Sequence, residues 1–155
     1  MPDLGREIGK KGKFASLEQE TALNLQRAAD RLEAPFDALF QEHGLSSAQY
    51  NALRIIRGAG PLGTPIQRIG EHMITRQPDM TRLVDRLEKA GFVERKRCDE
   101  DRRVIYATLT KDGKEILRKL DKPVLEIHQK QFAHMKKEQV EMLNALLYLA
   151  RQAPD

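Results

Sequence analysis

The sequence predicts a mainly α-helical (α+β) protein in which a single β-hairpin interrupts a series of helices. Apolar residues recur every three to four positions through most of the 155-residue chain. The periodicity changes between residues 92 and 110, where two runs rich in β-branched and aromatic residues flank a polar stretch. Hydrophobic residues make up 40% of the chain, which is enough to form a core. The predicted element order is therefore α-α-α-α-β-β-α-α.

The N-terminal part of the chain predicts an arm followed by a long helix. Residues 1–15 carry 4 basic and 2 acidic side chains without periodicity, so we expect a flexible basic arm. Ser16 followed by Gln19 has the spacing of a capping box and predicts the start of a helix over residues 16–43. Pro35 predicts a kink in this helix rather than its end, because the apolar stripe continues past the proline.

Three shorter helices are predicted next. Ser46 has the same capping-box spacing and precedes a helix that ends in the glycine-rich segment GAGPLG. Thr64 followed by Pro65 predicts another helix start, since threonine is a good N-cap residue and proline suits the first helical position. After a turn, Pro78 is placed to begin the next helix, and Gly91 suits its C-terminal end.

The C-terminal half of the chain predicts a hairpin and two further helices. The strands are expected at residues 92–98 and 104–110, joined by a polar tip. Thr110 is the predicted N-cap of a long amphipathic helix, which contains a proline at Pro123. A last amphipathic helix ends near Ala150.

Residues 46–110 have the order helix, turn, helix and charged hairpin, which is that of a winged helix-turn-helix with a two-stranded β-wing. A helix fits the major groove of DNA, where each base pair presents its own pattern of donors and acceptors. Arginine at a hairpin tip can enter the minor groove, whose negative potential attracts it. Residues 76–114 carry 11 basic and 8 acidic side chains. We therefore predict double-stranded DNA as the partner of residues 46–110.

The candidate DNA-binding residues follow from base chemistry. Arginine can bind guanine, glutamine can bind adenine, and a carboxylate can accept from cytosine. Arg86 suits either a phosphate contact or pairing with neighbouring carboxylates, and both alternatives stay open. The predicted recognition-helix residues are Arg76, Gln77, Asp79, Met80, Thr81, Arg82 and Arg86. The predicted wing residues are Asp101, Arg102 and Arg103, and the first helix of the motif contributes Thr64.

One segment resembles the signature of MarR-type winged helix-turn-helix regulators: MTRLVDRLEKAGFVERKRCDEDRRVIYATLTKDGKEIL. The most specific part is Asp101-x-Arg103, followed by Leu109-Thr110 and Gly113. The combination of this wing with the preceding helix carries the resemblance.

A looser similarity to the same family extends over residues 16–151. The resemblance implies that Arg103 reaches the minor groove, that Asp101 orients it, and that the helix beginning near Gln77 is the recognition helix. Residues 77–80 (Gln-Pro-Asp-Met) depart from the small hydroxyl and β-branched residues usual there, which affects the base preference. The resemblance also implies a dimer that binds palindromic operators, often as a repressor released by a small phenolic or other effector or by cysteine oxidation.

A homodimer also follows from physical reasoning. Amphipathic helices in residues 16–43 and 111–155 have apolar surface beyond what one winged-helix core covers, and a partner copy would cover it. The alternative is that these helices fold back on their own domain. An effector entering the cleft between the dimerisation region and the DNA-binding lobe would shift the spacing of the recognition helices. The candidate effector contacts are Tyr50, Arg54 and His72.

The sequence therefore predicts a dimeric, sequence-specific transcriptional regulator, a repressor of palindromic operators modulated by a small aromatic or phenolic effector. The alternative is a winged-helix module that binds proteins, which salt-dependent binding to duplex DNA would discriminate. An enzyme is not predicted, because there is no GxSxG sequence and no phosphate-binding glycine loop. No cofactor is expected.

The histidines and the single cysteine predict no metal site. The spacing of the four histidines matches no zinc pattern, although a site built across a dimer interface from His128 or His134 is an alternative. Cys98 is interpreted as structural or incidental, with a redox switch as the alternative. The longest apolar run has six residues (Ala145–Ala150), so we predict no membrane segment. The sequence has one cysteine and no secretory h-region, and it therefore predicts a cytoplasmic protein.

Overall fold

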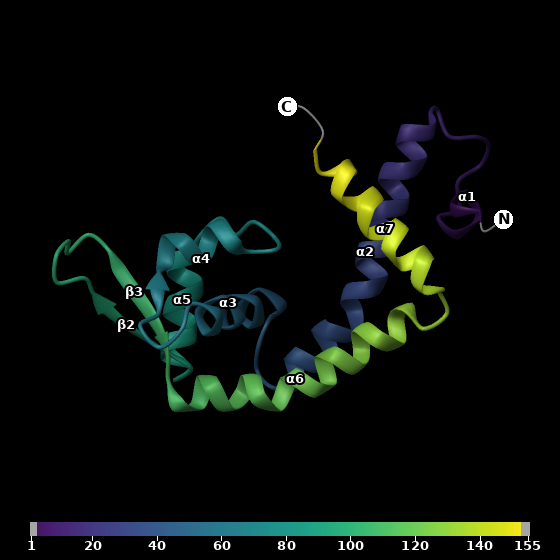
Figure 1. The fold of residues 1–155 in the computed structure, drawn as a ribbon. Helices are drawn as coiled ribbons and strands as arrows, with labels where there is room; N and C mark the ends of the chain where they lie inside the picture. The colour runs from purple at the N-terminus through teal and green to yellow at the C-terminus, as the bar shows by residue number, and fades with distance from the viewer. Residues whose placement is uncertain (1–2, 153–155) are drawn as a thin grey trace.

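The computed structural model describes residues 3–152, in which two groups of elements are joined by one long helix (Figure 1). The winged-helix lobe contains α3 (Ser47–Gly58), α4 (Ile66–His72), α5 (Met80–Lys89) and a small sheet. The terminal region contains α1 (Leu4–Glu7), α2 (Leu17–Glu42) and α7 (Lys137–Ala150). Helix α6 (Lys111–Phe132) runs from the lobe to the terminal region.

The caps of the long helices agree with the sequence. The Ser16 hydroxyl accepts from the N–H of Gln19 at the start of α2, and the Thr110 hydroxyl accepts from the N–H of Gly113 at the start of α6. Both helices contain their proline in the interior, as the continuous apolar stripes predict. None of the helices in the described part of the chain combines the length and apolar content needed to span a bilayer.

Helix α1 was not expected, because residues 1–15 have no periodicity. The Asp3 carboxylate accepts from the N–H of Gly5 at 2.9 Å, and the Leu4 side chain is buried. Glu7 of α1 lies 4.0 Å from Arg27 of α2. Residues 4–7 therefore pack as a short helix near α2, at the opposite end of the molecule from the wing (Figure 1). Residues 1–2 of the predicted arm lie outside the described residues.

The sheet has three antiparallel strands rather than the predicted two, in the order β1-β3-β2. Strands β2 (Val93–Arg97) and β3 (Ile105–Leu109) form the wing, and β1 (Thr64–Pro65) pairs with the other edge of β3. Thr64 is therefore a strand residue, and α4 begins after Pro65 without a side-chain cap. Gly63 has φ +73°, and a Cβ there would lie 2.1 Å from the carbonyl oxygen of Ala107. This close approach requires glycine and brings β1 onto β3.

The hydrophobic core lies in the winged-helix lobe. It is centred on α3, which packs against α2, α4, α5, α6 and β3. Its largest fully buried side chains are Leu53, Ile56, Ile69, Leu87, Leu117, Leu120, Val84 and Val93. Helix α2 adds Phe40, whereas α7 has no buried residue. The terminal helices thus retain uncovered apolar surface.

Candidate nucleic-acid interface

The turn between α4 and α5 is held by a contact from α3. The side-chain oxygen of Asn51 accepts from the N–H of Ile74 at 2.9 Å. The Gln77 side chain donates to the carbonyl oxygen of Thr75 at 3.2 Å within the same turn. Ile74 is 89% exposed, which places an apolar side chain on the surface beside the start of α5. Sequence reasoning missed Asn51 and Ile74, because their relation depends on how α3 packs against the turn.

Helix α5 begins at Met80, two residues after the predicted start at Pro78. Asp79 is the N-cap residue, and its carboxylate accepts from the N–H of Arg82 at 2.9 Å. Aspartate is one of the best N-cap residues, so the helix begins after Asp79 rather than at Pro78. Arg76 and Gln77 consequently belong to the turn and not to the recognition helix.

Three of the predicted DNA-binding residues also take part in the fold of the lobe. One carboxylate oxygen of Asp79 accepts the hydrogen bond of the helix cap, and the side chain is exposed, so the predicted contact with cytosine would have to use the other oxygen. The Met80 side chain is half-buried against α4, where a Cβ added to Gly70 would lie 3.0 Å from its Cγ. Thr64 is buried in β1, away from solvent. The exposed residues that remain on α5 are Thr81, Arg82 and Arg86.

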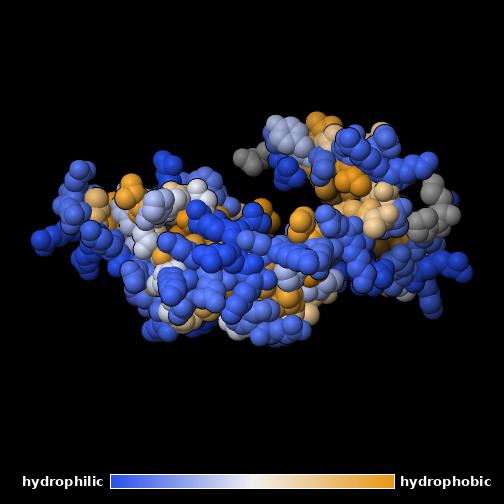
Figure 2. All heavy atoms as spheres, turned by 60° about the horizontal axis from the view of Figure 1, so that its bottom comes forward, coloured by the Kyte–Doolittle hydropathy of each residue, from blue (hydrophilic) through white to orange (hydrophobic). Residues whose placement is uncertain are grey.

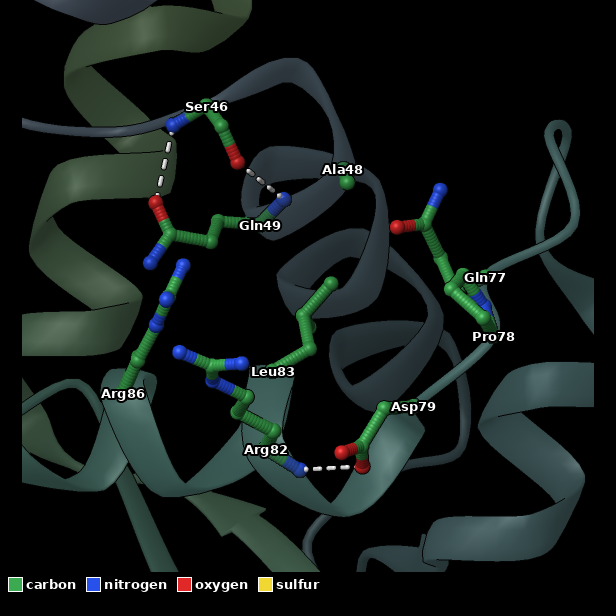
Figure 3. A pocket seen from close by; sticks show the side chains of 9 residues that line it. All are labelled: Ser46, Ala48, Gln49, Gln77, Pro78, Asp79, Arg82, Leu83 and Arg86. Carbon is green, nitrogen blue, oxygen red and sulfur yellow. Dashed lines mark hydrogen bonds between the residues drawn. The ribbon is translucent and has the colours of Figure 1, made fainter.

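Arg82 and Arg86 line a cavity of about 300 Å³ between α5 and the start of α3 (Figure 3). In this view Arg86 extends toward Gln49, and both arginine side chains come from α5. Gln49 and Ser46 form a capping box at the start of α3, as predicted. Within residues 3–152, neither arginine forms an ion pair with a carboxylate. Two guanidinium groups that line one cavity and have no carboxylate partner within the described residues suit an anion such as a phosphate.

The carboxylates of α5 pair with other cations. Asp85 lies 2.9 Å from the ammonium group of Lys89 and 3.1 Å from the guanidinium of Arg95, and Glu88 lies 2.6 Å from the same guanidinium. A hydrogen bond from Lys89 lowers the pKa of Asp85, and one from Arg95 lowers the pKa of Glu88. Asp85 and Glu88 thus pair with Lys89 and Arg95, and residues 3–152 show no ion pair of Arg86 with either carboxylate. A phosphate contact of Arg86 stays a prediction.

The wing tip presents its arginines to solvent. Asp101, Arg102 and Arg103 are all exposed. The Asp101 carboxylate accepts from the backbone N–H of Arg103 at 3.0 Å, and its carbonyl oxygen accepts from the N–H of Val104 at 3.0 Å. Asp101 therefore acts on the backbone that carries Arg103, closing the turn on which the arginine stands, and not on its guanidinium.

An ion pair joins the lobe to the long helix. The Arg57 guanidinium of α3 donates to both carboxylate oxygens of Asp121 of α6, at 2.8 and 3.0 Å. This hydrogen bonding holds the pKa of the Asp121 carboxyl below its usual range, and the charge of Arg54 acts in the same direction. Bidentate pairing fixes direction as well as distance, so the pair aligns α3 with α6.

The three predicted effector contacts differ in their exposure and surroundings. Tyr50 is buried, and its ring stacks on Phe40 with centroids 4.2 Å apart, so it belongs to the core between α2 and α3. Arg54 is exposed one turn further along α3. His72 is exposed at the end of α4, where its ring bonds to the carbonyl oxygen of Arg68. Arg54 lies close enough to the ion pair to help lower the pKa of Asp121, and Tyr50 close enough to contribute to the raised pKa of Arg57.

The lowered pKa of Asp121 predicts a pH-dependent stability. A carboxyl whose pKa is depressed by folding stabilises the folded state above its unfolded pKa of about 3.9, and this contribution disappears as pH falls through the depressed value. Asp121→Asn should therefore reduce the free energy of unfolding by about 0.2–1 kcal/mol near neutral pH, since the pair is largely exposed. Denaturant unfolding at fixed protein concentration should show this difference vanishing in acid.

The control for this prediction is Asp99→Asn. Asp99 is exposed at the wing, and no ion pair is described for it within residues 3–152. Its replacement should leave the unfolding free energy unchanged across the same pH range. A difference between wild type and Asp121→Asn that persists undiminished at low pH would contradict the assigned cause.

Cys98 and the histidines add no further group to this interface. Cys98 is a half-buried free thiol at the end of β2. In the part of the chain from residue 3 to residue 152, no group of three or more His, Cys, Asp or Glu side chains could hold a metal ion.

Known proteins resemble this chain in the same region that forms the winged-helix lobe. The model of the MarR family matches residues 45–105, which contain α3, the helix-turn-helix and the wing up to β3. The HTH-type transcriptional regulator YkoM of Bacillus subtilis is 31% identical to this chain over 114 residues, covering 69% of this chain and 71% of YkoM.

Solved structures extend the similarity to the terminal helices. A MarR transcription factor from Planctomyces limnophilus is 38% identical, with a TM-score of 0.68 over 88% of this chain and 99% of that one. Sco3205, a MarR family regulator from Streptomyces coelicolor solved in complex with DNA, has a TM-score of 0.81 at 23% identity, over 92% of this chain and 91% of that one. The predicted winged-helix fold is confirmed, and the chain belongs to the MarR family of helix-turn-helix transcriptional regulators.

Proposed function

We propose that this regulator binds a palindromic DNA operator as a homodimer and represses transcription from it. The observation that carries the proposal is that one lobe exposes three arginines for which residues 3–152 show no ion pair. Arg82 and Arg86 stand free on α5, and Arg103 stands at the tip of the wing. In this arrangement α5 occupies a major groove and Arg103 the adjacent minor groove. The solved complex of Sco3205 with DNA supports DNA binding by a protein of this fold.

The homodimer is supported by the apolar surface of the terminal helices. Figure 2 shows hydrophobic side chains gathered over this region, whereas the outer end of the wing is hydrophilic. On α7, Met142, Leu146, Tyr148 and Leu149 are each more than half exposed, and Leu17 on α2 is 73% exposed. A contiguous apolar surface of this kind marks an interface, and a second copy of the chain offers the matching surface.

Charged residues on this surface should prevent dimerisation. The double variant Leu146→Lys, Leu149→Lys would bury two ammonium groups in the interface, so we expect the mass in sedimentation velocity to fall from two chains to one. Leu62→Lys is the matched control, because Leu62 is 85% exposed in the loop before β1 and lies outside the terminal helices. A double variant that keeps the mass of the wild type would place the interface elsewhere.

Effector modulation is the third part of the proposal. A small aromatic or phenolic ligand with an anionic group would act at the junction of the lobe with α6, where Arg54 lies near the Arg57–Asp121 pair. Competition for Arg57 would loosen the pair that aligns α3 with α6, and so change the spacing of the two recognition helices. Binding of such ligands, measured by calorimetry, should weaken when Arg54 or Arg57 is replaced by alanine.

Selection of bound duplexes from a random pool tests the proposal directly. We expect a palindrome whose half-sites are separated by about 10 base pairs, one turn of the helix. Binding should weaken steeply with added salt, because each phosphate contact releases counterions. If the purified protein shows no salt-dependent binding to any duplex, a winged-helix module that binds proteins becomes the better interpretation.

A further inference from the structure

Arg95 lies in β2, at the base of the wing, and contacts two carboxylates of α5. Its Nε and Nη2 atoms donate to one oxygen of Glu88 at 2.8 and 2.6 Å, and Nη2 lies 3.1 Å from Asp85. Asp85 and Glu88 are three residues apart and therefore share one face of α5. The Arg95 side chain is 26% exposed, so these contacts are partly shielded from water. We call Asp85, Glu88, Lys89 and Arg95 the Arg95 cluster.

Glu88 also holds the backbone of the wing. The N–H of Arg95 donates to the second oxygen of Glu88 at 3.2 Å. Strand β2 is an edge of the sheet, since the strand order is β1-β3-β2. An edge strand presents N–H groups that no neighbouring strand can pair, and Glu88 satisfies one of them. The recognition helix is thus joined to the wing through both side-chain and main-chain hydrogen bonds.

We propose that Arg95 is a positioning residue for DNA recognition, which together with Glu88 and Asp85 fixes the wing relative to α5. The inference rests on the proposed DNA binding. Arg103 stands at the exposed tip of the hairpin, so a small rotation at the base of β2 would displace it from a groove that α5 has already aligned. A wing held in place before binding loses less conformational freedom in the complex, which strengthens binding without a further contact to DNA.

A different role for Arg95, direct contact with a phosphate, makes the opposite prediction for one variant. Glu88→Gln removes a negative charge and releases Arg95 from its strongest partner. If Arg95 bound phosphate, this change would leave operator affinity unchanged or increase it. If Arg95 positions the wing, the same change weakens operator binding, although the protein has become more basic.

The affinity experiment compares three variants on the selected operator. Glu88→Gln and Arg95→Lys should each weaken binding by about 3- to 30-fold, the latter because lysine cannot make the forked contacts of a guanidinium. Glu94→Gln is the charge-matched control: Glu94 is exposed on β2 beside Arg95 and has no ion pair within residues 3–152. It should bind as well as the wild type or better. When Glu88→Gln is already present, adding Arg103→Ala should weaken operator binding much less than it does in the wild type, since the wing is no longer aligned.

A spectroscopic experiment tests the position of the wing without DNA. Cys98 is the one cysteine of the chain and lies at the end of β2, so a nitroxide attached there reports the motion of the wing. Its spectrum should indicate greater mobility in Glu88→Gln and Arg95→Lys than in the wild type and Glu94→Gln, while thermal unfolding shows all four proteins folded. Unchanged mobility, or operator affinity that rises in Glu88→Gln, would overturn the inference.

The affinity experiment and the nitroxide experiment together distinguish failure of this inference from failure of the proposed function. If the wild type binds no duplex, the proposed function is wrong, and the role of Arg95 in DNA recognition fails with it. The nitroxide spectra then still decide whether the Arg95 cluster holds the wing. If the wild type binds its operator and Glu88→Gln binds equally well, the inference about Arg95 fails and the proposed function stands.

Discussion

Arg103→Ala is expected to weaken operator binding by about 5- to 150-fold, which corresponds to about 1–3 kcal/mol. The guanidinium stands at the exposed tip of the wing, and Asp101 holds its backbone N–H at 3.0 Å. In the proposed complex, removing it deletes a cation from the minor groove, where the negative potential is enhanced. Fluorescence anisotropy with the selected operator at several salt concentrations measures both the affinity and the salt slope, which should fall in magnitude by about one contact.

Arg118→Ala is the matched control for this experiment. Arg118 is exposed on α6, outside the recognition helix and the wing, and its replacement removes the same charge. Its affinity for the operator should stay within about twofold of the wild type, because the loss of distant surface charge is screened by salt. Equal losses for the two variants would mean that net charge, and not the wing, determines affinity.

Gly113→Ala is expected to destabilise the fold by about 1–3 kcal/mol or more, the usual cost of forcing extra volume into a packed site. A Cβ at Gly113 would lie 2.1 Å from the carbonyl oxygen of Phe92, a backbone atom that cannot move aside alone. Thr110 stabilises the same junction by donating to the carbonyl oxygen of Gly91 at 2.6 Å. Thermal unfolding should therefore show a clear decrease in Tm, with loss of operator binding as the wing separates from α6.

Gly58→Ala is expected to have the opposite effect and to increase the free energy of unfolding. Gly58 is the last residue of α3, and a Cβ there meets no atom within 4 Å. Replacing a helical glycine by alanine at an unstrained position stabilises a protein by about 0.4–1 kcal/mol, chiefly by restricting the unfolded chain. If Gly113→Ala were as stable as Gly58→Ala, the close approach of α6 to Phe92 would not be a feature of the protein in solution.

The Gly113 contact also gives a physical reason for part of the family signature. Sequence reasoning used Leu109-Thr110 and Gly113 as a pattern, without a cause for the glycine. In the structure, Thr110 caps α6, and the Cα of Gly113 passes close to the backbone of Phe92. The signature thus includes residues that join the wing to α6, as well as the residues of the wing tip.

Sequence reasoning failed where a residue's surroundings come from distant parts of the chain. Thr64 has the local features of an N-cap residue, yet it pairs with β3, more than 40 positions later. Met80 stands at the start of an exposed helix, but its side chain fills the space above Gly70. The Arg57–Asp121 pair joins residues 64 positions apart, and no local pattern indicates it.

The sequence by itself determined the order of the elements other than α1 and β1, the caps of α2, α3 and α6, and the signature that identifies the family. These features depend on hydrogen bonds and apolar contacts between residues that are near neighbours in the chain. Only the tertiary structure decided which cations are free. Arg95 and Lys89 are paired with the carboxylates of α5, while Arg82 and Arg86 remain unpaired in the described residues. That outcome depends on how a helix and a strand pack together, because a charge pairs with whatever group the fold brings within reach.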